Sequence, residues 1–239
     1  MKVIIAIPTY NENNNISILL DRIFSLKTSY EIEVLIIDDN SPDGTADTVN
    51  HLISSNNNLH IIERKAKLGL GSAYCEAFRW TRVRDFDYFI QMDADLSHNP
   101  DDILELLEKA KLNKVIIGSR YKTGVNVVNW PLRRLILSYL ANVYARVITG
   151  LKVNDLTSGF KCIPVPVLKS FDIDRIKSEG YSFQIEINCI CNNLGFQIDE
   201  VPIIFYDRTN GTSKMSKKII FEAIFRVPIF RLKKIFKLW

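Results

Sequence analysis

The chain opens with a short apolar run, Val3-Ile4-Ile5-Ala6-Ile7, and passes directly into a polar cluster, Pro8-Thr9-Tyr10-Asn11-Glu12. The apolar run is rich in β-branched residues, and a continuous run of this kind is typical of a parallel strand that is covered on both faces. Residues 33–37 repeat the apolar pattern, and Asp38-Asp39-Asn40-Ser41 follow them. Further strands of this type are expected at 59–62, 88–92 and 115–117.

Helical stretches are expected between these strands, near residues 13–28, 45–55, 71–84 and 100–112. The last of them has a clear start, because Asn99 can cap it and Pro100 suits the first helical position. Strands that alternate with helices form βαβ units. The first half of the chain therefore predicts an α/β fold with a twisted, largely parallel sheet.

The second half is organised differently. A long helix with a broad apolar face is expected at 130–149, followed by a short strand at 159–163 and a helix from Pro166. A helix near 181–194 and an apolar strand at 201–206 come next. The final segment, 214–239, is expected to be helical with a break near Pro228.

The charge is concentrated at the end of the chain. Residues 213–239 contain eight Lys and Arg against one Glu, a net +7, which leaves the remainder near −3. On a helix these basic residues lie opposite Ile, Leu, Phe and Trp, and such amphipathic helices lie in the membrane interface. No run of about 18 apolar residues predicts a membrane-spanning helix, and no signal peptide is recognisable. We expect a cytoplasmic protein that binds the membrane face peripherally, with no nucleic-acid partner.

Four polar clusters fall at the ends of predicted strands: residues 8–12, residues 38–41, Asp93-Ala94-Asp95, and Gly118-Ser119-Arg120-Tyr121. The carboxyl ends of parallel strands meet at one edge of a sheet, where ligands bind. Alternation along an extended chain sends Asp93 and Asp95 to the same side. Mg²⁺ or Mn²⁺ prefers such hard oxygen ligands, completed by water and phosphate. Helix-capping or turn aspartates are the alternative reading of this pair.

Other motifs favour structural roles. Gly69-Leu70-Gly71 does not fit a dinucleotide-binding fingerprint, and a tight turn before the helix near 71–84 is the preferred reading. His98 could line the site, although packing or capping is the simpler role. The four cysteines have no metal-binding or disulfide spacing, so buried thiols are expected.

The motifs together resemble the inverting glycosyltransferases of family 2, and within it the dolichyl-phosphate mannosyltransferases and their polyprenyl-phosphate relatives. Asp155-Leu156-Thr157-Ser158-Gly159-Phe160 and Gly180-Tyr181-Ser182-Phe183-Gln184 extend the resemblance, which covers about residues 3–214. It implies a GT-A fold, with a Rossmann-like nucleotide half followed by an acceptor half. The resemblance assigns 1–213 to the catalytic domain and leaves 214–239 as the membrane-interface tail.

The resemblance also implies roles for individual residues. The nucleotide sugar would be held by Pro8, Tyr10, Glu12, Asp39, Asp93, Ala94, Asp95 and Arg120, of which Asp93, Asp95 and Arg120 would be catalytic. The metal that bridges the diphosphate would be bound by Asp93 and Asp95, with Ser97 as an extra ligand. The acceptor phosphate would meet Arg120, Arg133, Arg208 and Lys214. The Q-x-x-R-W motif of processive relatives is absent, which favours a single transfer.

The expected reaction moves a hexose, with mannose from GDP-mannose preferred, onto dolichyl or another polyprenyl phosphate. A phosphate monoester is largely dianionic at pH 7, so it can attack the anomeric carbon without a general base. A hydroxyl acceptor would need one, and Asp155 and Glu186 are the candidates. UDP-glucose as donor, a hydroxyl acceptor and a non-catalytic membrane adaptor remain alternatives. A sugar-nucleotide pyrophosphorylase is disfavoured because its glycine-rich N-terminal loop is missing. A membrane-anchoring protein partner is a further expectation.

Overall fold

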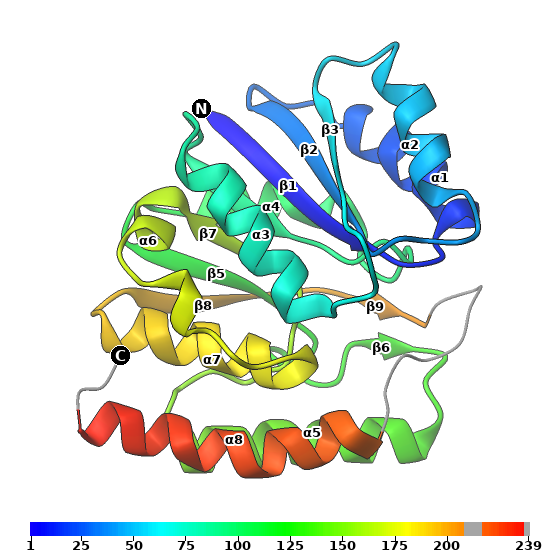
Figure 1. Ribbon diagram of the computed structural model, residues 1–239. Helices are drawn as coiled ribbons and strands as arrows, with labels where there is room; N and C mark the ends of the chain where they lie inside the picture. Colours follow the sequence, from blue (N-terminus) through cyan, green and yellow to red (C-terminus); the bar gives the residue numbers. More distant parts are fainter. Residues whose placement is uncertain (208–216, 237–239) are drawn as a thin grey trace.

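A seven-stranded sheet forms the centre of the molecule (Figure 1), which we describe from a computed structural model covering residues 1–207 and 217–236, without the side chains of 217–221. The strand order is β3-β2-β1-β4-β7-β5-β8, and only β7 runs antiparallel to its neighbours. The strands are β1 (Lys2–Thr9), β2 (Glu31–Asp38), β3 (Leu59–Glu63), β4 (Tyr88–Gln91), β5 (Lys114–Ser119), β7 (Lys161–Pro164) and β8 (Gln197–Pro202). The predicted α/β fold with a mostly parallel sheet is confirmed.

Helices cover both faces of this sheet. Successive side chains of a strand point to opposite faces: Val3, Ile5 and Ile7 of β1 pack in the core on the side of α1, α2 and α4, whereas Ile4 and Ala6 pack on the side of α3, α6 and α7. This explains why the first strand is apolar at every position. The helices are α1 (Asn13–Phe24), α2 (Thr45–Ile53), α3 (Leu70–Arg82), α4 (Asp102–Lys109), α6 (Val165–Lys169) and α7 (Gly180–Asn193), with a 3₁₀ turn at Ile173–Arg175.

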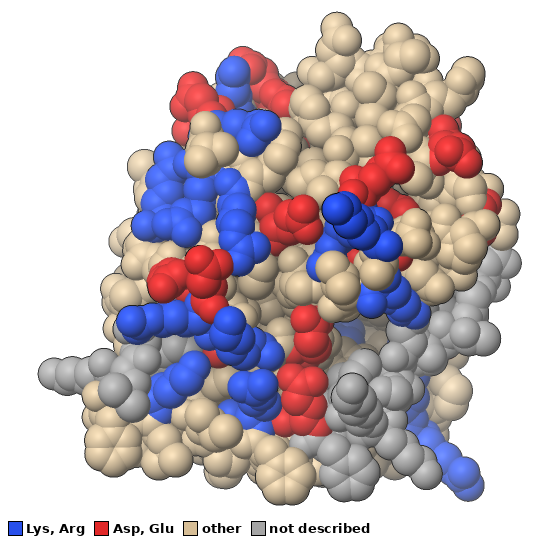
Figure 2. Space-filling model, viewed as in Figure 1, with Lys and Arg blue, Asp and Glu red and all other residues tan. Residues whose placement is uncertain are grey.

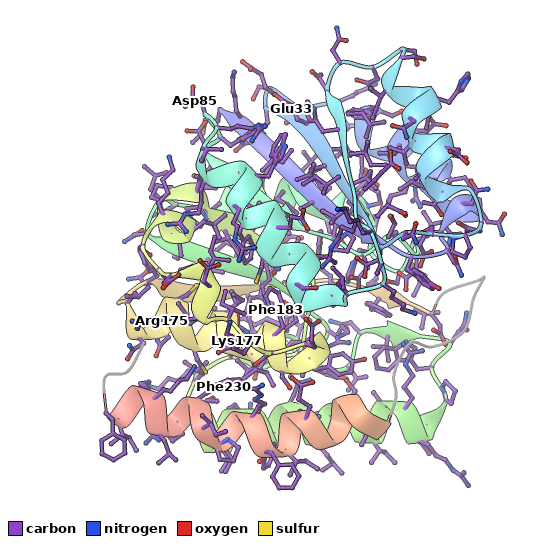
Figure 3. All side chains as sticks on the ribbon, viewed as in Figure 1. Glu33, Asp85, Arg175, Lys177, Phe183 and Phe230 are labelled. Atoms are coloured by element: carbon purple, nitrogen blue, oxygen red, sulfur yellow. The ribbon has the colours of Figure 1, made fainter. Side chains whose placement is uncertain are left out.

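Two further helices, α5 (Leu132–Thr149) and α8 (Lys217–Ile235), form a separate layer at the lower edge of Figure 1. Val227 and Phe230 of α8 are 0% and 1% exposed and pack with Ala145 of α5 and Ile185 of α7. Figure 3 shows Phe230 between α8 and the body of the protein. Burying a phenylalanine side chain stabilises a fold by about 1.5–3 kcal/mol. The basic segment that ends the chain therefore contributes side chains to the core.

The apolar segment expected as one strand at 201–206 is divided in two. Its first part belongs to β8, and its second part forms β9 (Phe205–Tyr206), which pairs in parallel with β6 (Val127–Val128). The partner strand lies between the strand expected at 115–117 and the helix expected at 130–149, where the sequence predicts no strand. A two-residue strand has no periodicity of its own, so this small sheet depends on a contact that the sequence does not display.

The expected break near Pro228 is wrong, because α8 continues through this residue. A proline inside a helix has no N–H to donate to the carbonyl group four residues earlier, here that of Ile224. Tyr144 of α5 donates its hydroxyl hydrogen to the Ile224 carbonyl oxygen at 2.8 Å. The neighbouring helix thus supplies the donor that Pro228 lacks, and the packing of Val227 and Phe230 holds α8 in place on either side of the proline.

Within residues 1–207 and 217–236, no helix combines the length and the apolar character needed to cross a bilayer.

Candidate active site

A cleft of about 220 Å³ lies at the carboxyl ends of β1 and β4. From β1 the sheet continues to β2 and β3 on one side and to β4 on the other, and ligands of open α/β sheets bind at such a reversal of strand order. Six residues that the sequence predicts as part of the donor site line this cleft: Pro8, Glu12, Asp93, Ala94, Asp95 and Arg120. The structure therefore brings together polar ends that lie more than one hundred residues apart in the chain.

The aspartate pair directly follows β4. Asp95 is followed by Leu96, whose φ of +61° lies in the left-handed region that non-glycine residues rarely adopt. This turn directs Ser97 back to Asp95, where its N–H and hydroxyl donate to Oδ1 at 3.2 and 2.5 Å. Ser97 is 1% exposed and does not line the cleft, and its two hydrogen bonds orient the Asp95 carboxylate.

The donor set at this turn fits a divalent cation that is shared with a ligand. Asp93 and Asp95 both line the cleft, and carboxylate oxygens are the ligands that Mg²⁺ and Mn²⁺ prefer. Among the side chains described, no group of three or more His, Cys, Asp and Glu could hold an ion. A cation held by Asp93 and Asp95 would need further oxygens from a diphosphate and water, as is usual for Mg²⁺ at phosphate sites.

His98 both lines the cleft and packs beneath it. Its ring stacks on Phe160 with centroids 4.8 Å apart and meets Phe205 edge-on. Burial lowers its pKa, although Asp93 and Asp95 act in the opposite direction. The backbone N–H of Asp93 donates to Nδ1 of His98 at 3.4 Å. A neutral imidazole that accepts this bond supports the position of the aspartate turn.

Arg120, at the end of β5, is held by Asp155. Its Nε and Nη2 donate to the two carboxylate oxygens of Asp155 at 2.7 and 2.6 Å, and Nη2 also donates to Thr157 Oγ1 at 2.9 Å. Burial alone would raise the pKa of Asp155, but Arg120 outweighs it and lowers the pKa. The same pair raises the pKa of Arg120 against the effect of burial. Asp155 is fully buried, and both of its carboxylate oxygens accept hydrogen bonds from Arg120.

The two other residues predicted to hold the nucleoside, Tyr10 and Asp39, do not line the cleft. The ring of Tyr10 lies 3.8 Å from the ammonium group of Lys67. Asp39 is 6% exposed, pairs with the guanidinium group of Arg64, and accepts the N–H of Gly69 at 3.0 Å. Asp39 thus fixes the loop that enters α3.

The glycines of that loop are required by packing. Gly69 has a φ of +103°, and a Cβ atom on Gly71 would lie 2.3 Å from the carbonyl oxygen of Ser178. The first N–H groups of α3 are occupied by the carboxylate of Glu179, which accepts from Gly71 at 2.7 Å and from Ser72 at 3.1 Å. Burial raises the pKa of Glu179, and these two bonds oppose the rise. Gly69 thus lies at the turn that enters α3 and Gly71 in the first turn of the helix, in agreement with the structural role preferred for this motif.

Of the four basic residues predicted near the acceptor phosphate, the structure describes two, Arg120 and Arg133. Arg133 is exposed on α5 and does not line the cleft, whereas its neighbour Arg134 does. Nη1 of Arg134 pairs with Asp207 at 2.6 Å, and its guanidinium group lies 4.1 Å from the centre of the Trp130 ring. Two predicted residues, Arg208 and Lys214, lie outside the described residues.

The sequence motifs gave no individual role to several residues that line the cleft. They come from the segments after Arg120 in the chain and are Arg134, Thr157, Ser158, Gly159, Tyr181, Gln184 and Phe205. Most of them belong to the two later motifs of the resemblance, so the motif itself was the available signal. Arg134, Thr157 and Tyr181 also line a second, apolar groove of about 410 Å³ between α5 and α8. The cleft and this groove therefore share one wall.

Comparison with known proteins agrees with this arrangement. The family model of glycosyl transferase family 2 matches residues 4–171. An undecaprenyl-phosphate mannosyltransferase from Micrococcus luteus is 39% identical over 95% of this chain and 93% of its own. A polyprenol monophosphomannose synthase from Mycolicibacterium smegmatis is 39% identical over 95% of this chain and 85% of its own.

Solved structures give the same fold at lower identity. Glucosyl-3-phosphoglycerate synthase from Mycobacterium tuberculosis, in complex with phosphoglyceric acid, superposes with a TM-score of 0.68 at 18% identity and covers 95% of this chain and 80% of its own. The same enzyme in complex with Mn²⁺, UDP-glucose and phosphoglyceric acid superposes with a TM-score of 0.66 at 18% identity, covering 95% of this chain and 79% of its own.

Proposed function

The chain belongs to glycosyltransferase family 2, and we propose that it transfers a mannosyl group from GDP-mannose to a polyprenyl phosphate of the dolichyl or undecaprenyl type. The observation that carries this proposal is the shared wall between a cleft that carries the Asp93 and Asp95 carboxylates and an apolar groove. A lipid phosphate has the same two parts, a charged head and an apolar chain. The two relatives at 39% identity are named for transfer to undecaprenyl phosphate and for polyprenol monophosphomannose synthesis.

The cleft would hold the donor. Pro8 and Glu12 lie on the β1 side of the cleft, where the nucleoside would bind with Tyr10 and Asp39 nearby, and Asp93 and Asp95 lie at the end of β4. A Mg²⁺ or Mn²⁺ ion held by these two aspartates would neutralise the diphosphate as it leaves the sugar. In the structural relative, Mn²⁺ and UDP-glucose are bound together. Ser97 would act through Asp95, to which it donates.

The groove would hold the acceptor lipid. Most of its lining is apolar and comes from three helices: Leu137, Leu140, Ala141 and Tyr144 of α5, Ile185 of α7, and Ala223, Ile224 and Val227 of α8. A polyprenyl chain is a hydrocarbon, so its transfer into such a groove is favourable in proportion to the apolar area buried. At the cleft end, Arg134 offers a guanidinium group, which binds phosphate oxygens. Arg133, Arg208 and Lys214 remain candidates for further contacts with this phosphate.

The buried carboxylates favour a phosphate acceptor over a hydroxyl acceptor. Asp155 and Glu186, the candidates for a general base, are 0% and 1% exposed and do not line the cleft. Asp155 is paired with Arg120, and Glu186 accepts from Ser178 N–H and Lys233. A dianionic phosphate needs no base to attack the anomeric carbon, and in-line attack inverts that centre.

The surface near α5 and α8 is suited to a membrane face. Exposed apolar side chains gather there, among them Leu132 at 69%, Val147 at 72%, Phe225 at 70% and Phe236 at 66%. Figure 2 shows basic side chains above this lower edge, whereas the edge itself is mostly uncharged. Amphipathic helices of this composition lie in the interface and attract anionic lipids. We place the enzyme at the cytoplasmic face of a membrane as a peripheral protein, with a membrane-anchoring subunit as an additional partner.

Transfer assays test this proposal. Purified protein with Mn²⁺ is incubated with GDP-mannose or UDP-glucose and with polyprenyl phosphate or the corresponding polyprenol. We expect mannose to appear on the lipid phosphate only. Transfer to the polyprenol, or transfer from UDP-glucose alone, would contradict the proposal.

A groove variant separates the acceptor from the donor. Ala141→Trp should fill the groove, so transfer to long polyprenyl phosphates should fall while GDP-mannose affinity is retained. Val83→Trp is the control, because this residue is 81% exposed at the end of α3 and lines neither the groove nor the cleft. Equal activities of the two variants would remove the groove from the acceptor site.

A further inference from the structure

A buried lysine lies beneath one wall of the cleft. Lys161 of β7 is 0% exposed, and its Nζ donates to the side-chain Oε1 of Gln184 at 2.5 Å and to the main-chain carbonyl of the same residue at 3.1 Å. Burial lowers the pKa of Lys161 to about 7. Charged or neutral, the amine has at least two N–H groups for these two acceptors.

This contact fixes the orientation of the Gln184 amide. A carboxamide has one acceptor oxygen and one donor NH₂ group, and which end faces which neighbour follows from the hydrogen-bond network. Because the oxygen faces the amine of Lys161, the nitrogen must face the other way. Gln184 lines the cleft, so the NH₂ group is presented on that side.

The NH₂ group of Gln184 has no hydrogen-bond partner among the described residues, although the side chain is only 2% exposed. A buried donor without a partner costs about 1–3 kcal/mol, so such a group calls for an explanation. The position of the amide nitrogen follows from the neighbouring Gly159. A Cβ atom on this glycine would lie 3.5 Å from Nε2 of Gln184 and also 3.5 Å from Oδ1 of Asp93, so the two side chains approach the same point. The donor is therefore directed to the part of the cleft beside the aspartates.

We propose that the Gln184 amide is a specificity-determining donor that binds a hydroxyl oxygen of the transferred sugar, and that Lys161 is a positioning residue that holds this amide in place. This inference rests on the proposed function. An uncharged N–H donor suits an uncharged hydroxyl, whereas the phosphate oxygens would be bound by the cation at Asp93 and Asp95 and by the guanidinium group of Arg134. Gly159 leaves the space between the amide and the carboxylate open, where a side chain would fill it.

The test is a set of binding measurements on the full chain. Calorimetry with Mn²⁺ compares GDP, GDP-mannose and the four GDP-deoxymannoses that lack the 2-, 3-, 4- or 6-hydroxyl. Gln184→Leu should bind GDP like the parent protein and GDP-mannose about 10- to 100-fold more weakly, the cost of one lost hydrogen bond in a buried site. For the single analogue that lacks the bonded hydroxyl, the parent and the variant should bind alike.

Gln184→Glu is the matched variant that keeps the shape of the side chain. Its carboxylate would pair with Lys161 and could only accept, so the sugar hydroxyl would have to reverse the direction of its hydrogen bond. The discrimination between GDP-mannose and the critical deoxy analogue should therefore differ from that of the parent protein. An equal loss of GDP affinity in both variants would assign the amide to a phosphate oxygen. Parent and variant affinities that differ by the same factor for every analogue would also overturn the proposal.

Lys161→Met tests the positioning role. It should leave GDP affinity unchanged and reduce the discrimination between GDP-mannose and the critical deoxy analogue, but have no such effect in the Gln184→Leu background. If Lys161→Met discriminates between GDP-mannose and the deoxy analogue as well as the parent protein does, Lys161 does not position the amide. A change in melting temperature alone does not bear on this role. If the parent protein binds no GDP-mannose, the proposed donor is wrong, and the same comparison is made with UDP, UDP-glucose and its deoxy analogues.

Discussion

The hydrogen bond between α5 and α8 gives a quantitative prediction about stability. Tyr144 donates to the carbonyl oxygen of Ile224, which Pro228 leaves without a helical partner. A hydrogen bond of this kind contributes about 0.5–1.5 kcal/mol net. Tyr144→Phe should therefore lower the free energy of unfolding by about 1 kcal/mol, which is a fall of about 2–4 °C in melting temperature for a chain of this size.

The proline allows a double-mutant cycle. Pro228→Ala restores an N–H group that can donate to Ile224 within the helix, so Tyr144→Phe should cost close to nothing in that background. The coupling free energy is then about 1 kcal/mol, measurable by urea unfolding of the four proteins. Tyr139→Phe, on the same helix but packed edge-on against Tyr121, is the control. An identical cost of Tyr144→Phe in both backgrounds would refute the reasoning, because the bond would then be independent of the proline.

Three other variants test the core beneath the site. Asp155→Asn leaves the buried charge of Arg120 without its partner, so it should cost about 3–5 kcal/mol in chemical denaturation and abolish transfer; a stability equal to that of the parent would contradict the assigned pair. Because burial lowers the pKa of Lys161 from 10.5 to about 7, its cost to folding is complete below pH 7 and disappears as the pH approaches the unfolded value, so Lys161→Met should raise the melting temperature more at about pH 6 than at about pH 10. A shift that does not vary with pH would exclude a depressed pKa. Gly71→Ala places a methyl group 2.3 Å from the Ser178 carbonyl oxygen and should destabilise the protein by about 1–3 kcal/mol, whereas an unchanged denaturation midpoint would show that the two segments separate easily.

Much of the nucleotide half can be predicted from sequence because its signals are local. The run from Val3 to Ile7 is apolar at each position since both faces of β1 are covered. Parallel strands also bring their polar ends to one edge, so Asp93 and Pro8 could be assigned to one site without coordinates. Both residues line one cleft, and the structure adds the left-handed turn at Leu96, for which no sequence rule exists.

The acceptor half is harder to predict because its contacts join distant segments. Arg134 faces the cleft and Arg133 does not, a difference set by the rotation of α5 on its neighbours. Likewise, the pairing of Arg120 with Asp155 and the contact of Lys161 with Gln184 join residues 35 and 23 positions apart. The carbonyl group that Pro228 leaves without a helical partner accepts from a tyrosine of another helix. None of these follows from propensity or periodicity.

Metal-dependent binding of the donor nucleotide tests the central claim most directly. Mn²⁺ affinity is measured by electron paramagnetic resonance, with and without GDP, for the parent protein, Asp95→Asn and Asp85→Asn. The control residue is exposed and precedes β4, at the opposite end of the sheet from the cleft (Figure 3). We predict that GDP strengthens Mn²⁺ binding in the parent and in Asp85→Asn, and that Asp95→Asn loses this coupling and all mannosyl transfer. Undiminished coupling or turnover in Asp95→Asn would contradict a metal site at these two aspartates.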